Sequence, residues 1–139
     1  MWNMIWPMAL VVVSNSLYHV VAKETPAGAN AFLSLTVTYL TAAAVSAVMF
    51  LAGGSGLLPE LKRLNWTAPV MGAVIIGLEL GYILIYRAGW KVSLGSLAAN
   101  LCLACVLLAV GVLVYREAVT LRQLAGVAVC AVGLVLVTR

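Results

Sequence analysis

The stretch Thr67-Ala-Pro-Val-Met-Gly-Ala-Val-Ile-Ile-Gly-Leu-Glu79-Leu-Gly-Tyr-Ile-Leu-Ile-Tyr-Arg-Ala88 is mostly apolar and carries a single carboxylate near its centre. A helix needs about 20 mostly apolar residues to cross a membrane, so this stretch predicts a span. An acid at the centre of a bilayer costs about 2.5–3.5 kcal/mol. Glu79 is therefore expected to have a function or a partner that offsets this cost.

The whole chain has the composition of a membrane protein. Its 139 residues are 65% hydrophobic and 9% charged, and the mean hydropathy is +1.14. A soluble domain of this size needs more polar side chains to cover its surface. We therefore predict an all-α integral membrane protein with one domain over residues 1–139. Its five expected membrane-spanning helices cover approximately residues 4–22, 30–52, 67–88, 94–115 and 120–137.

The positive charges of the chain do not favour either orientation in the membrane. With five spans, one side receives Lys62, Arg63, Arg116 and Arg122, and the other receives Lys23, Arg87, Lys91 and Arg139. Positive residues in short loops normally set the orientation, and here the two sides carry four each. Two copies in opposite orientations are therefore expected to pair as an antiparallel homodimer, which forms an inverted repeat. The alternative is a single orientation set by a lipid or a partner.

Polar and ionisable side chains from four of the expected spans fall at similar depths in the membrane. A rise of about 1.5 Å per residue places them within about two helical turns of one another, near the midplane. Within a span they recur at helical spacing and so share a face. Because polar groups in lipid need partners, we predict a common substrate- or proton-binding site. Its candidate residues are Asn15, Tyr18, His19, Tyr39, Glu79, Tyr82 and Asn100.

A simpler role for Glu79 is also open. Its carboxyl can hydrogen-bond Asn15 or His19 and hold helices together without binding a substrate. His19 can likewise be a satisfied interior histidine instead of a proton relay. In the functional interpretation, the carboxyl of Glu79 releases a proton when a substrate binds and takes one up when the substrate leaves.

The last expected span has small residues on one face. Gly126 and Gly133 lie on that face at heptad spacing, with Cys130 beside them. Small residues let helices approach closely in lipid. This face therefore predicts a helix-packing surface, either within one copy or between the two copies of a dimer.

Other function classes find little support in the sequence. The odd number of cysteines and their apolar surroundings argue against a disulfide framework or a zinc site. There is no nucleophile–base pair and no phosphate-binding loop, so we predict neither an enzyme nor a cofactor. The net charge of +4 is spread over short loops, which is typical of membrane topology and not of a nucleic-acid-binding surface.

Two stretches carry a family resemblance. They are Tyr86-Arg-Ala-Gly-Trp-Lys-Val-Ser93-Leu-Gly-Ser-Leu and Val114-Tyr-Arg-Glu117-Ala-Val-Thr120-Leu-Arg-Gln-Leu-Ala-Gly126, followed by the glycine-rich last helix. They resemble the carboxy-terminal part of an EamA domain, the repeat unit of the drug/metabolite transporter (DMT) superfamily. The resemblance is strong over about residues 80–139 and implies a five-helix half-transporter, which larger members fuse as inverted repeats. The related small multidrug resistance proteins act as antiparallel dimers, joined through a glycine pair at the spacing of Gly126 and Gly133.

One position departs from that family. Small multidrug resistance proteins bind cations and protons through a glutamate in the first helix, and the matching position here, counted back from Lys23, is Asn15. The resemblance therefore does not carry over an essential acid, and Glu79 lies on a different helix. Glu117 belongs to the loop motif and is expected to be structural.

These observations lead to one expected function and two alternatives. We expect a small transporter of the drug/metabolite type that moves a small polar or cationic solute, with Glu79 as the candidate site of proton coupling. The alternatives are a flippase or scramblase for a lipid-linked metabolite and an accessory subunit of another membrane transporter. The expected partners are membrane lipid, a small-molecule substrate and a second copy or a paralogue. The expected location is a bacterial or archaeal inner membrane.

Overall fold

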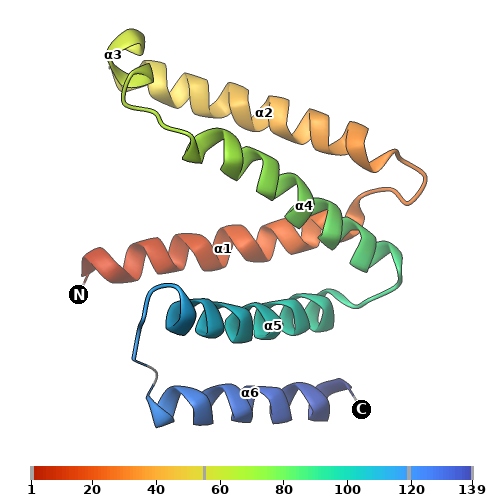
Figure 1. The fold of residues 1–139 in the computed structure, drawn as a ribbon. Helices are drawn as coiled ribbons and strands as arrows, with labels where there is room; N and C mark the ends of the chain where they lie inside the picture. Colours follow the sequence, from red (N-terminus) through yellow and green to blue (C-terminus); the bar gives the residue numbers. More distant parts are fainter. Residues whose placement is uncertain (1, 55, 119, 139) are drawn as a thin grey trace. The chain divides into compact units, whose positions relative to one another are not determined.

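The computed structural model describes residues 2–54, 56–118 and 120–138, and within them every regular element is a helix (Figure 1). The helices are α1 (Trp2–Glu24), α2 (Ala31–Ala52), α3 (Leu57–Leu61), α4 (Thr67–Arg87), α5 (Val92–Leu113) and α6 (Leu121–Thr138).

Four of these helices, α1, α2, α4 and α5, are long and apolar enough to cross a membrane. They confirm the prediction of an all-α fold, and their length and composition indicate a multi-pass membrane protein. Helix α6 has 18 residues, but its apolar stretch within the described part, Leu121–Gly133, is shorter than a span. The fifth span therefore stays a prediction.

The ends of the long helices lie within two residues of the predicted ones. Helix α2 begins one residue later because Asn30 is its N-cap. The Asn30 Oδ1 accepts hydrogen bonds from the backbone N–H groups of Phe32 (2.9 Å) and Leu33 (3.2 Å). Helix α3 was not predicted, because the glycines before it and Pro59 inside it are typical of a loop. Proline is tolerated there because it lies in the first turn, where N–H groups have no helical partner.

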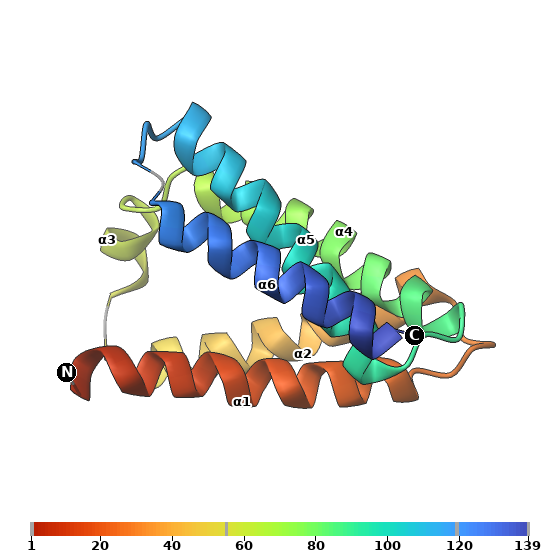
Figure 2. The same ribbon diagram turned by 90° about the horizontal axis from the view of Figure 1, so that it is seen from below.

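The chain divides into two compact units, one ending at Arg87 and one beginning at Ala88. In the first unit, α4 packs against both α1 and α2, whereas α1 and α2 make no contact with each other within the described residues. Figure 1 shows α4 between them, and Figure 2 shows α1 and α2 on the same side of α4. The second unit is an antiparallel pair formed by α5 and α6.

Little of the apolar surface is buried inside the chain. The few buried side chains gather where the carboxyl-terminal halves of α1 and α4 meet the start of α2, and they are His19, Ala22, Leu35, Ile83 and Tyr86. Most large apolar side chains on every helix are exposed. Such a surface suits contact with lipid or with another membrane protein, not with water.

Two basic side chains, Arg87 and Lys23, form hydrogen bonds that connect α1, α4 and the α1–α2 loop at this end of the first unit. Arg87 Nη2 donates hydrogen bonds to the carbonyl oxygens of Pro26 (3.1 Å) and Ala29 (2.7 Å) in the α1–α2 loop. Lys23 Nζ donates to the carbonyl of Tyr86 (3.4 Å) in the last turn of α4. Positive groups are favourable at the carboxyl terminus of a helix because its free carbonyls carry partial negative charge.

The loop between α5 and α6 explains much of the motif that carried the family resemblance. The Glu117 N–H donates to the Gly111 carbonyl (2.9 Å), and a Cβ added at Gly111 would lie 2.7 Å from Glu117 Oε2. Gln123 Oε1 accepts from the Thr120 N–H (2.8 Å) and hydroxyl (3.0 Å), while the Gln123 N–H donates to Thr120 Oγ1 (3.3 Å). This is a capping box at the start of α6. The arrangement agrees with the structural role expected for Glu117.

Candidate functional site

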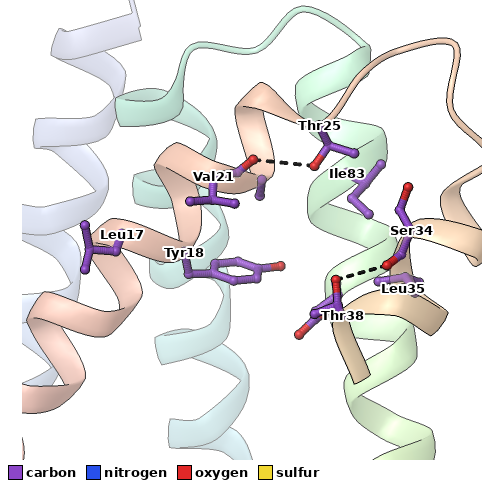
Figure 3. A pocket seen from close by; sticks show the side chains of 10 residues that line it. Leu17, Tyr18, Val21, Thr25, Ser34, Leu35, Thr38 and Ile83 are labelled. Atoms are coloured by element: carbon purple, nitrogen blue, oxygen red, sulfur yellow. Dashed lines mark hydrogen bonds between the residues drawn. The ribbon is translucent and has the colours of Figure 1, made fainter. Parts of the chain in front are cut away.

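A cavity of about 290 Å³ lies between α1 and α2, with α4 behind it, because the backbones of the first two helices are not closely packed. We call it the α1–α2 cleft (Figure 3). Its polar lining residues are Tyr18, Thr25, Ser34, Thr38 and Glu79, and its apolar lining residues are Leu17, Val21, Ala22, Leu35 and Ile83. Figure 3 shows Tyr18 reaching from α1 into the cleft, with Ser34 and Thr38 on α2 opposite it.

Glu79 is half-buried on the wall that α4 contributes. Its carboxyl lies close enough to the hydroxyls of Tyr18 and Tyr39 to interact electrostatically with both. No hydrogen bond of normal geometry joins the carboxyl to the Tyr39 hydroxyl. No salt bridge links Glu79 to a basic side chain in the part of the chain that the structure describes. The carboxyl therefore lies near two phenols, without a counter-charge from the described residues.

Several buried polar atoms around Glu79 have no hydrogen-bond partner. They include the hydroxyls of Tyr18 and Tyr39 and the Nε2 of His19. Buried polar groups in folded proteins are nearly always hydrogen-bonded, so unpaired groups gathered in one place need an explanation. Of these groups, the Tyr18 hydroxyl belongs to a residue that lines the α1–α2 cleft.

His19 links α1 to α4 through a hydrogen bond and ring contacts. Its side chain is only 5% exposed, and its Nδ1 lies 2.9 Å from the Tyr86 hydroxyl. Its ring meets those of Tyr18 and Tyr82 edge to face, with centroids 5.2 and 4.7 Å away. Such contacts orient the rings and stabilise the pair of helices. His19 is thus an interior histidine with one satisfied nitrogen and one free nitrogen.

The structure brings together five of the seven predicted site residues, namely Tyr18, His19, Tyr39, Glu79 and Tyr82. Asn15 is exposed on α1 and does not line the cleft, and Asn100 is exposed on α5, in the other unit. Among the described residues, no hydrogen bond joins Glu79 to Asn15 or His19, and its neighbour across the helices is Tyr39 of α2. The helix-locking role of Glu79 stays open. The binding role of the seven residues stays a prediction.

The predicted set missed Tyr86 and the hydroxyl residues of the cleft. Tyr86 lies two turns after Glu79 on the same helix face, a spacing that the sequence displays. For Thr38, no spacing pattern in the sequence indicates that it faces the cleft. Thr36, Thr38 and Thr41 all donate to a carbonyl one turn earlier in α2, at 2.8, 3.0 and 2.9 Å. Because each satisfies its proton locally, sequence alone does not reveal which one faces a cleft.

The glycine face of α6 is not packed by α5. Gly126 and Cys130 are exposed, and a Cβ added at Gly126 or at Gly133 would meet no atom within 4 Å. Helix α5 instead lies against another face, where Leu124 and Val127 line a shared cavity with residues of α5. The glycine face was predicted to pack either within one copy or between copies, and within the second unit it does not pack against α5. Packing against another part of the same copy stays open. Packing between copies stays a prediction.

A metal centre finds no support within the described ranges, where no group of three or more His, Cys, Asp or Glu side chains could hold an ion. Cys102 and Cys105 do have the spacing of a Cys-x-x-Cys pair, but both are exposed on α5 as free thiols. The chain matches no protein-family model, no curated protein and no solved structure. The resemblance to the EamA domain therefore stays an expectation.

Proposed function

We propose that the chain is a small membrane transporter of the drug/metabolite type, which moves a small polar or cationic solute and couples its movement to a proton on Glu79. The observation that carries this proposal is the α1–α2 cleft. It combines a carboxyl without a basic partner in the described chain, a Tyr18 hydroxyl without a hydrogen-bond partner and an opening between two helices long and apolar enough to cross a membrane. Ionisable groups inside membrane spans commonly mark substrate and proton pathways.

The transporter works as an antiparallel homodimer or as a pair with a paralogue. The equal distribution of positive charge over the two predicted sides supports insertion in both orientations. The unpacked face of Gly126, Cys130 and Gly133 supports a close helix contact between copies. In such an inverted pair, the two copies exchange conformations and expose the cleft alternately to each side of the membrane.

The test is proton release during substrate binding and transport by the purified chain in liposomes. Small amines, other cations and sugars are screened with the wild type, Glu79→Gln and Glu60→Gln. Glu60 is the matched control because it lies on α3 outside the cleft, where it forms an ion pair with Arg63 at 2.8 Å. We expect substrate-dependent proton release in the wild type and in Glu60→Gln, and none in Glu79→Gln. A Glu79→Gln protein that folds and transports like the wild type would contradict the proposal.

A second candidate, a flippase for a lipid-linked metabolite, is favoured by the lack of contact between α1 and α2. A cleft between two separated spans opens sideways, so a lipid headgroup can enter it from the bilayer. The same liposomes distinguish the two candidates. A transporter moves a water-soluble solute in vesicles without the lipid, whereas a flippase acts only when the lipid is present.

A further inference from the structure

We infer that the α1–α2 cleft selects solutes with a primary ammonium group on a short apolar body and discriminates against quaternary ammonium and anionic solutes. This inference rests on the proposed function, because it names the class of solute that the Glu79 site would carry. It follows from a count of the hydrogen-bond donors and acceptors that line the cleft.

Three of the five polar lining side chains have already used their only proton. The hydroxyls of Thr25, Ser34 and Thr38 donate to the carbonyl oxygens one turn earlier, those of Val21 (3.4 Å), Asn30 (3.1 Å) and Ser34 (3.0 Å). A hydroxyl has one proton and two lone pairs. After donating to its own helix, each of these residues can only accept a hydrogen bond from a ligand.

The other two polar lining residues do not reverse this balance. Glu79 as a carboxylate accepts through two oxygens, and Tyr18 is the one lining residue whose hydroxyl proton has no acceptor within the described chain. The lining includes no lysine, arginine or histidine. Acceptors therefore outnumber donors, and a ligand that satisfies the cleft has to bring several donors of its own.

The charge of the cleft favours a cationic donor. Glu79 has no salt bridge to a basic side chain in the described residues, and a lone carboxylate is costly at membrane depth. A primary ammonium group supplies both the missing charge and three N–H donors. A quaternary ammonium group supplies the charge but no N–H, so the acceptors of the cleft would lose water without gaining partners. A carboxylate or phosphate would be repelled by Glu79.

The volume and the apolar lining of the cleft restrict the size and the polarity of the part of the solute that carries the ammonium group. The cavity of about 290 Å³ lies at the lower end of the range of about 300–1,000 Å³ for small-molecule sites. Leu17, Val21 and Ile83 provide apolar walls. A short alkyl chain fits these walls, whereas a sugar would place hydroxyls against them.

The test is equilibrium binding to the purified chain in nanodiscs of zwitterionic lipid, which removes the attraction of cations to anionic lipid. The probes are hexylamine, hexyltrimethylammonium, hexanol and hexanoate. We expect hexylamine to bind about tenfold or more tightly than hexyltrimethylammonium, because the quaternary analogue covers the acceptors of the cleft without donating a hydrogen bond to them. Hexanoate is expected to show no binding that depends on Glu79, and Glu79→Gln is expected to abolish the preference for hexylamine.

Two threonines on α2 provide a matched pair of variants. Thr38 lines the cleft, while Thr41 makes the same kind of bond to its own helix, with the Val37 carbonyl at 2.9 Å, and lies outside the cleft. Thr38→Val is expected to weaken hexylamine binding about fivefold, and Thr41→Val to leave it unchanged. Thr38→Ser keeps the hydroxyl and is expected to restore binding, which separates loss of an acceptor from loss of packing.

Equal affinities for hexylamine and hexyltrimethylammonium, or equal effects of the two valine variants, would overturn the inference. The inferred ligand class and the proposed transport function are refuted by different results. Binding of hexylamine that needs Glu79, without flux of any screened solute, would refute the proposed transport function and leave the ligand class intact. Flux of a sugar that needs Glu79, without binding of hexylamine, would refute the ligand class and leave the transport function intact.

Discussion

The first unit, built from α1, α2 and α4, and the second unit, built from α5 and α6, both consist of apolar helices but arrange them differently. In the first unit, α1 and α2 stay apart, and ionisable and phenolic side chains fill the region between them and α4. In the second unit, two helices pack directly, and the conspicuous polar contacts lie in the loop between them. Hydropathy therefore identifies apolar helices in both units, whereas the placement of polar groups distinguishes the unit proposed to bind a solute from the unit in which two helices pack.

The largest expected effect comes from the same chemical change made in both regions. Glu79→Gln is expected to lower substrate transport in liposomes about 100-fold or more, because it removes a charged hydrogen-bond partner of the solute. Glu117→Gln is expected to keep transport within about twofold, since Glu117 contacts Gly111 in a loop. Comparable losses in the two variants would remove the distinction between the regions.

The next effect concerns association through α6. Replacing Gly126 and Gly133 together by leucine is expected to weaken dimer formation about tenfold, because the added side chains keep the helices of two copies apart. Chemical crosslinking through Cys130 in nanodiscs measures the dimer fraction. Gly72→Leu on α4 is the control, because a Cβ there also meets no atom within 4 Å. An undiminished dimer would assign the interface to another surface.

A smaller effect is expected at the contact between Gly111 and Glu117. Gly111→Ala is expected to lower the free energy of unfolding by about 1 kcal/mol, the low end for overpacking, because the new Cβ would lie 2.7 Å from Glu117 Oε2, the end of a flexible side chain that can partly move aside. Adding Glu117→Ala to this variant is expected to recover most of the loss. Unfolding in mixed detergent micelles measures both values, and Gly126→Ala serves as the unstrained control. A neutral Gly111→Ala would show that the loop moves away without loss of stability.

The smallest effect concerns the hydrogen bond between His19 and Tyr86 in the first unit. Tyr86→Phe is expected to lower the free energy of unfolding by about 1 kcal/mol, because the His19 Nδ1 loses its hydrogen bond of 2.9 Å while the ring contacts remain. Tyr115→Phe is the control on an exposed tyrosine of the second unit. The same unfolding measurement applies, and equal stability of Tyr86→Phe and the wild type would show that this hydrogen bond is not needed.

Some of the site was predictable, and the reason differs from residue to residue. Tyr18 and His19 are adjacent, and Glu79 and Tyr82 share a helix face, so their spacing placed them correctly in pairs. Depth counted along straight helices also brought Tyr39 beside Glu79. The same count placed Asn15 near them, yet Asn15 is exposed on α1. Depth alone does not say how far a helix is rotated about its own axis.

The long helices were predictable from the sequence, because the apolar character of about 20 consecutive residues is a local property. It is sufficient by itself to favour a helix in a bilayer. The capping box of Thr120 and Gln123 is local in the same way, although it was recognised only in the structure. The cleft was decided by the tertiary structure alone. It exists because α4 separates α1 from α2, and the rotation and crossing of packed helices then select Thr38 over Thr41 and Tyr18 over Asn15 as lining residues. These choices depend on contacts between residues far apart in the chain, which no local pattern encodes.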